Sequence, residues 1–172
     1  MKKSFVPNFF SALTILLFAT WFGSYVARQV MVYQLFEPVN LDLKPIYNSQ
    51  NLYAVISVIM PVLITNLVSF PLFIISFVLY IAIAKINIKK EGWLFLTTVV
   101  IIITAPFEFY LSSSIDYKIV KLMINSSSDI NETINLLRSR ITELSSFPLI
   151  EVFSYVGLVF VIIFKPLRKN EN

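Results

Sequence analysis

Four long apolar blocks, separated by polar segments, dominate this 172-residue sequence; they cover residues 5–27, 52–84, 93–111 and 149–164. A helix needs about 20 apolar residues to cross a hydrocarbon core of about 30 Å. Residues 147–148 extend the last and shortest block toward that length. Hydrophobic residues make up 57% of the chain and charged residues 14%, which leaves too little polar surface for a water-soluble domain. The blocks therefore predict transmembrane helices.

The second block, residues 52–84, is long enough to raise the question of one span or two. As a single helix it would measure about 50 Å, whereas two antiparallel spans would need about 40 residues and a turn. We therefore predict one long helix, bent or tilted, whose first turns rise out of the bilayer. Pro61 and Pro71 are the expected kink points.

The predicted fold is all-α: a polytopic membrane protein with a four-transmembrane-helix bundle and a small helical extracytoplasmic cap, forming one membrane domain over residues 1–172. The spans are expected at about 5–28, 53–85, 93–112 and 148–165, and the helical loop at about 113–147. The basic start and first apolar block also fit a secretory signal, but the apolar core is long for one, so we expect an uncleaved anchor.

Basic residues are distributed unevenly between the two sides of the predicted bundle. Eight of the fourteen Lys and Arg fall on one side: Lys2, Lys3, Lys85, Lys89, Lys90, Lys165, Arg168 and Lys169. The positive-inside rule then places both termini in the cytoplasm, with the protein in the cell (plasma or inner) membrane. The net charge of +4 is explained by this orientation, so no nucleic-acid partner is expected.

The outer loop before the last span contains a helical pattern. Asp129 and Glu132 fit a capping box at a helix start. Apolar residues then recur at steps of four and three, which predicts one buried helix face: Ile130, Ile134, Leu137, Ile141 and Leu144. Residues 115–124 are expected to continue the third span beyond the membrane. Together these segments would form the cap.

Two acidic residues lie inside the predicted spans, Glu108 in the third and Glu151 in the fourth. Charge inside a membrane is costly, so such residues are candidates for a functional role. Glu108 follows Trp93 by about 22 Å of helix, and Glu151 precedes Lys165 by about 21 Å. The two carboxyl groups are therefore expected at one level, in the outer third of the bilayer.

Other polar side chains are predicted to reach the same level. Arg28 can extend back into the bundle. Asn66 lies about 28 Å along a straight helix from Lys85, and a kink at Pro71 would lower it toward the glutamates. The candidate ligand-binding layer comprises Glu108, Glu151, Arg28, Asn66, Trp21 and Tyr25. Two interpretations stay open: a small pocket facing the outer side, or a structural ion pair that fixes helix register.

Aromatic and small residues have simpler expected roles. Four aromatic side chains are expected mainly as interfacial anchors: Trp21, Tyr25, Tyr110 and Tyr155. Small residues along the first span permit close packing within the bundle or against a partner subunit: Ser11, Ala12, Ala19, Gly23 and Ala27.

The sequence lacks both cysteine and histidine. This excludes disulfides, thiolate and imidazole metal sites, a Ser-His-Asp triad and the commonest general base. With only three glycines there is also no glycine-rich phosphate loop. We therefore predict no catalytic residues, no metal and no cofactor.

Several segments resemble the anthrone-oxygenase-like group of small four-helix membrane proteins. They are residues 46–54 (IYNSQNLYA), 59–62 (IMPV), 104–108 (TAPFE) and 137–140 (LRSR). The resemblance implies a four-helix fold. At 144–148 this chain has LSSFP, where that group typically has His, Asn and Arg, so the resemblance implies the fold and not the oxygenase activity.

The function we predict from sequence is therefore modest. The chain is interpreted as a non-catalytic integral membrane protein, a subunit or small-ligand site of a larger membrane assembly. Its expected partners are the lipid bilayer and either further copies or other membrane subunits. Two alternatives remain: a cofactorless anthrone-oxygenase-like membrane enzyme, and an oligomeric transporter or channel component.

Overall fold

The computed structural model describes residues 5–48, 51–88, 91–125 and 130–165, and over these residues the chain is helical apart from loops and one isolated bridge between Phe36 and Leu43. The elements are α1 (Phe5–Tyr33), α2 (Leu52–Ala84), α3 (Gly92–Leu111), the π-helical turn η2 (Ser112–Asp116), α4 (Tyr117–Ile124), α5 (Ile130–Thr142) and α6 (Phe147–Phe164).

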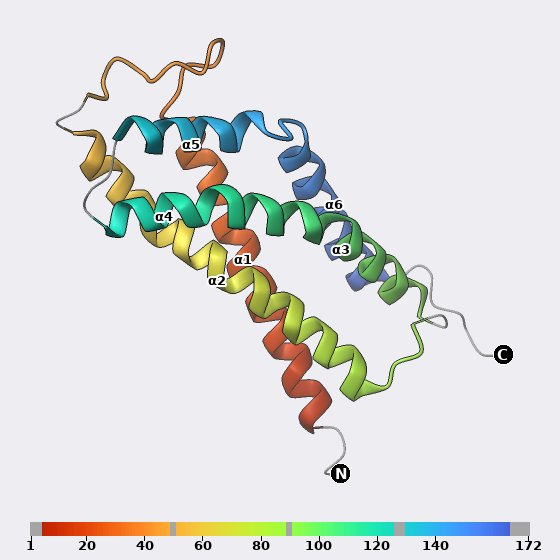
Figure 1. Cartoon of the computed structure of the whole chain (residues 1–172). Helices are drawn as coiled ribbons and strands as arrows, with labels where there is room; N and C mark the ends of the chain where they lie inside the picture. The colour runs from red at the N-terminus through yellow and green to blue at the C-terminus, as the bar shows by residue number, and fades with distance from the viewer. Residues whose placement is uncertain (1–4, 49–50, 89–90, 126–129, 166–172) are drawn as a thin grey trace.

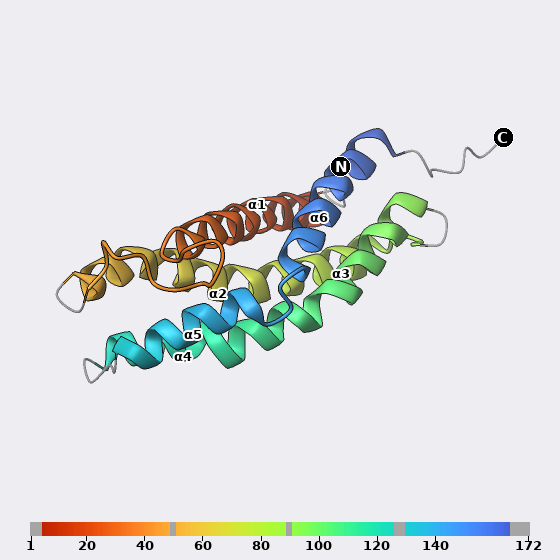
Figure 2. The ribbon, with the colours of Figure 1, turned by 90° about the horizontal axis from the view of Figure 1, so that it is seen from above.

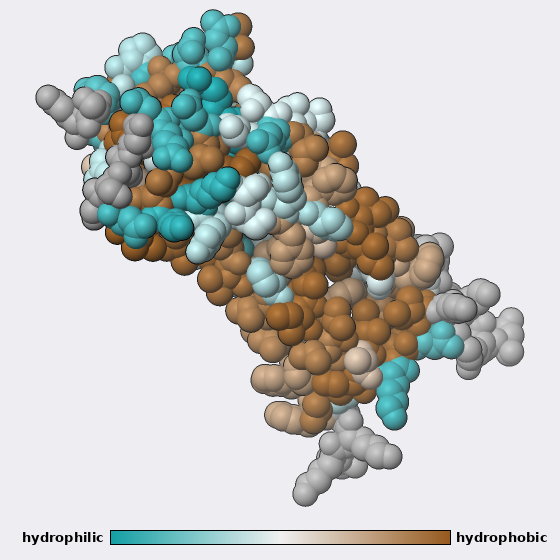
Figure 3. All heavy atoms as spheres, in the orientation of Figure 1, coloured by the Kyte–Doolittle hydropathy of each residue, from teal (hydrophilic) through white to brown (hydrophobic). Residues whose placement is uncertain are grey.

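Four of the described helical segments are long and apolar enough to cross a membrane: α1, α2, the continuous rod of α3, η2 and α4, and α6. Most of their side chains are not buried inside the protein. In Figure 3 hydrophobic residues cover the part of the molecule formed by the start of α1, the end of α2, α3 and α6, whereas hydrophilic residues gather over α5 and the segment before α2. The predicted all-α, four-helix bundle is confirmed.

The bundle is built from neighbouring helices of opposite direction. α1 and α2 lie side by side along their lengths, and α6 packs against α3 (Figures 1 and 2). The starts of α1 and α3 lie at the same end of the molecule as the ends of α2 and α6 (Figure 1). α5 lies along η2 and α4 at the opposite end, where it forms the cap.

The second apolar block is one helix, as predicted, because α2 runs without a break from Leu52 to Ala84 and includes Pro61 and Pro71. Hydroxyl groups of the helix bond back to its own carbonyls near the first proline: the Thr65 hydroxyl donates to the Pro61 carbonyl at 2.7 Å. Such bonds satisfy polar groups that lipid cannot.

Two boundaries differ from the predicted ones. α1 continues to Tyr33, beyond the expected end at residue 28, so Arg28 lies inside a helix rather than in a loop. α5 ends at Thr142, and the chain then turns toward α6, so Leu144 leaves the predicted apolar face; it has a φ of 56° and is 40% exposed. The expected N-cap, Asp129, lies outside the described residues.

The apolar interior forms two clusters, and polar residues lie between them. Along α1, Arg28 separates Tyr25 of one cluster from Val32 of the other. Asn66 occupies the same position on α2, and Glu108 on α3, each between residues of the two clusters. The core is thus divided by one polar layer.

Candidate functional site

Four charged side chains close into a ring inside the protein. Arg28 of α1 pairs with Asp116 of η2 and also with Glu108 of α3, whose Oε1 lies 3.5 Å from the arginine Nη2. Arg140 of α5 pairs with the same two acids, at 3.0 Å to Glu108 Oε2 and 3.3 Å to Asp116 Oδ1. All four are at most 2% exposed. We call them the charge ring; its positive and negative charges alternate and sum to zero.

The local geometry of η2 helps to place both acids on one face. In an unbroken α-helix, Asp116 would be rotated by about 80° from Glu108, eight residues earlier. The π-helical turn from Ser112 to Asp116 is wider than an α-helical turn and changes that offset. Ser112 lies between the acids, and its hydroxyl donates to Glu108 Oε1 at 3.3 Å.

Asn66 connects α2 to this ring. Its side-chain oxygen accepts a hydrogen bond from Arg28 Nη1 at 2.9 Å. Its amide nitrogen lies 3.4 Å from the Ser24 hydroxyl and 3.5 Å from the Trp21 carbonyl oxygen, both on α1. The fully buried Asn66 therefore holds α2 against α1 at the level of the charges.

The structure corrects the expected role of most of the aromatic residues. Trp21, Tyr25 and Tyr155 are fully buried instead of lying at an interface, whereas Tyr110 is 54% exposed. The Trp21 ring centroid lies 4.9 Å from those of Tyr155 and Phe70. The buried rings face inward and pack together beside the charge ring. We call Trp21, Tyr25, Phe70 and Tyr155 the aromatic layer.

Tyr25 and Glu151 are neighbours at the edge of the charge ring. The Arg28 guanidinium carbon lies 4.9 Å from the centre of the Tyr25 ring, a cation–π distance. Glu151 is fully buried and lies near Tyr25 and Glu108. No hydrogen bond of ordinary geometry joins its carboxyl group to another residue that the structure describes.

All six residues of the predicted layer thus lie in the interior and close to one another, each at most 1% exposed. The expected opening toward the outer side is absent at these residues, because their side chains are enclosed. Their assignment as ligand-binding residues stays a prediction. Arg28 contacts both Asn66 and Glu108, and these contacts fit the other interpretation, a structural ion pair that fixes helix register.

Sequence reasoning missed two members of the ring, Asp116 and Arg140, and counted both as charges of the outer loop. One signal for Asp116 was its spacing of eight residues, or two steps of four, from Glu108 on the same continuous helical segment. Arg140 lies between Leu137 and Ile141, which are both buried on the inner face of α5. A charged residue within such a face is a candidate for a buried pair.

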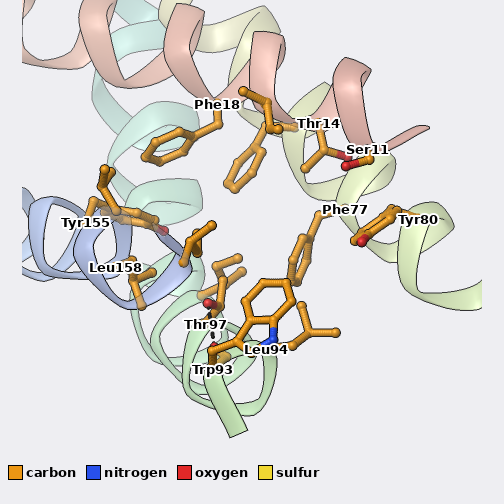
Figure 4. A pocket seen from close by; sticks show the side chains of 15 residues that line it. Ser11, Thr14, Phe18, Phe77, Tyr80, Trp93, Leu94, Thr97, Tyr155 and Leu158 are labelled. Atoms are coloured by element: carbon orange, nitrogen blue, oxygen red, sulfur yellow. Dashed lines mark hydrogen bonds between the residues drawn. The ribbon is translucent and has the colours of Figure 1, made fainter. Parts of the chain in front are cut away.

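A separate apolar cavity lies on the other side of the aromatic layer. Its volume is about 130 Å³, and its walls are almost wholly apolar. Side chains from α1, α2, α3 and α6 point toward this space (Figure 4). The layer's Tyr155 also lines the cavity, as does Phe73, whose ring is stacked on Trp21 with centroids 5.7 Å apart. None of the six predicted site residues lines it.

The described residues contain no group of three or more Asp and Glu side chains able to hold a metal ion. Comparison of the chain with protein-family models, with curated proteins and with solved structures found no match. The resemblance to anthrone-oxygenase-like proteins therefore stays a prediction. What the geometry offers is a neutral charge ring and an apolar cavity.

Replacing Arg140 should be far more damaging than replacing its neighbour Arg138. Arg140→Gln leaves two buried acids with a single arginine, and breaking a buried pair costs about 3–5 kcal/mol. Arg138 is 39% exposed, lies 3.9 Å from Asp42 and donates to the Leu41 carbonyl at 3.0 Å, so Arg138→Gln should cost about 2 kcal/mol or less. Reversible unfolding in a fixed lipid or detergent mixture measures both. Equal losses in the two variants would contradict a buried ring.

Proposed function

We propose that this chain is an integral membrane protein that binds the apolar part of a small lipid-like molecule between its four spanning helices, without catalysis. In this proposal it is a small-ligand subunit of a larger membrane assembly. The observation that carries the proposal is the apolar cavity, because residues from all four candidate spans contribute to its walls.

The size and walls of the cavity suit an apolar occupant. Apolar cavities of roughly 150 Å³ stay dry and accept small apolar molecules. The cavity is partly open, and some lining residues also reach the outer surface: Ile15 is 63% exposed and Ile162 is 38% exposed. In a bilayer these residues would face hydrocarbon, so a ligand can enter from the side.

Several hydroxyl groups at or beside the cavity already have hydrogen-bond partners within the protein, which supports binding rather than chemistry. The Thr97 hydroxyl donates to the Trp93 carbonyl at 2.8 Å, within its own helix. The Thr14 and Ser76 hydroxyls lie 2.9 Å apart and bond α1 to α2. The hydroxyls of Thr104 and Tyr155 pair at 2.8 Å. A lipid-like occupant would meet almost wholly apolar walls here.

The charge ring supports the same function indirectly. It joins α1, α3, η2 and α5, and Asn66 adds α2. Because these contacts fix the helices relative to one another on one side of the aromatic layer, they help to define the space on the other side. We therefore assign the ring a structural role in keeping the cavity open.

A cavity-filling substitution should remove the bound molecule. Val159 of α6 lines the cavity and is 39% exposed, so Val159→Trp can fill the space without disturbing the core. Ile163→Trp, one turn further along α6 at a position 66% exposed, is the matched control. Purification in mild detergent followed by lipid mass spectrometry should show at least a several-fold loss of the co-purifying ligand in the first variant alone. A wild-type protein without any bound lipid-like molecule, or equal retention in both variants, would overturn the proposal.

The proposal also includes an orientation with both termini in the cytoplasm, which rests on the distribution of basic residues. Because the chain contains no cysteine, single cysteines can be labelled without background. Val39→Cys, at a position 90% exposed beyond α1, should react with a membrane-impermeant maleimide on intact cells. Asn87→Cys, between α2 and α3, should react only after permeabilisation. The reverse pattern would show the opposite orientation.

A further inference from the structure

Among the described residues, Glu151 is the one acid beside the charge ring that forms no ion pair with an arginine. It lies in the second turn of α6 and is fully buried. Neither of its carboxyl oxygens makes a hydrogen bond of ordinary geometry to another described residue, although the Tyr25 hydroxyl lies beside the group. Buried polar groups are almost always paired, so an unpaired carboxyl group needs an explanation.

Counting charges shows why an arginine does not compensate this group. Arg28 and Arg140 each contact both Glu108 and Asp116, and those two acids neutralise them. Glu151 makes no ion pair with either arginine in the described structure. The cluster therefore contains three acids and two bases, and one negative charge would remain if all were ionised.

The groups that face Glu151 from the surrounding helices do not remove this excess. They are Tyr25 and Arg28 of α1, Glu108 of α3, Arg140 of α5 and, on its own helix, Tyr155. The two phenols are uncharged, the two arginines are shared with the ring, and Glu108 is a further negative charge. An isolated carboxylate in such surroundings is very costly, and the usual outcome is that the group takes up a proton.

We propose that Glu151 is a proton-binding site: its side chain is a neutral carboxylic acid in the membrane-embedded protein, and the ligand of the site is a proton. Of the three acids it is the one that takes the proton, because Glu108 and Asp116 each accept from two arginines. Its neighbour Tyr25 has a hydroxyl group that can donate to or accept from a carboxylic acid. The inference depends on the charge ring and not on the cavity.

Infrared spectroscopy of the whole protein in lipid vesicles at neutral pH tests this assignment. A protonated carboxyl group has a carbonyl stretching band that a carboxylate lacks. The band should be present in the wild-type protein, shift in D₂O, and shift again when glutamate is labelled with ¹³C at the side-chain carboxyl carbon. The isotope separates glutamate from aspartate without any substitution.

Substitutions then identify the residue. Glu151→Gln should abolish the band. In Glu151→Asp the band should no longer shift when glutamate is labelled, because the carboxyl group then belongs to an aspartate. Glu132→Gln, at an exposed position of the cap, should leave it unchanged. Absence of a ¹³C-sensitive glutamic acid band in the wild-type protein would overturn the proposal even if the variants fail to fold. Persistence of the full band in folded Glu151→Gln would also overturn it.

Discussion

Two arginines, each held between the same two acids, connect the parts of this protein that the sequence places far apart. Arg28 and Glu108 belong to long apolar helices, Asp116 to the π-helical turn, and Arg140 to the cap. Each charge would be costly to bury alone, but the alternating arrangement neutralises all four. The cap can pack on the bundle because Arg140 enters the ring, and removal of any member leaves an uncompensated charge.

The position of the ring divides the molecule into two halves with different characters. On one side, α5 and the adjoining parts of α1, α2 and α4 bury an apolar cluster beneath a hydrophilic surface. On the other, α1, α2, α3 and α6 surround the aromatic layer and the apolar cavity. Contacts at the level of the ring can thus fix the helices relative to one another, while a cavity remains between them on the other side of the aromatic layer. We connect the proposed binding function to this separation.

The sequence predicted the spanning helices because hydrocarbon requires long apolar runs, and length alone showed that α2 is one helix. Helix rise placed Glu108 and Glu151 at one level, and the reach of the Arg28 side chain predicted its pairing with Glu108, which the structure shows. The sequence did not reveal Asp116 or Arg140, because charges in a polar loop are ordinarily solvated. Their burial depends on the π-helical turn and on the docking of α5. The cavity was also hidden, because its size depends on helix separation.

The most direct test of the central ring is a double-mutant cycle across one of its sides, measured as unfolding free energy in a lipid bilayer. The cycle compares Arg140→Gln, Glu108→Gln and the double variant with the wild-type protein. Residues in one buried network should show a coupling energy of more than about 1 kcal/mol. Additive effects, with a coupling energy within about 0.5 kcal/mol of zero, would contradict the account, because the two side chains would not then share a network.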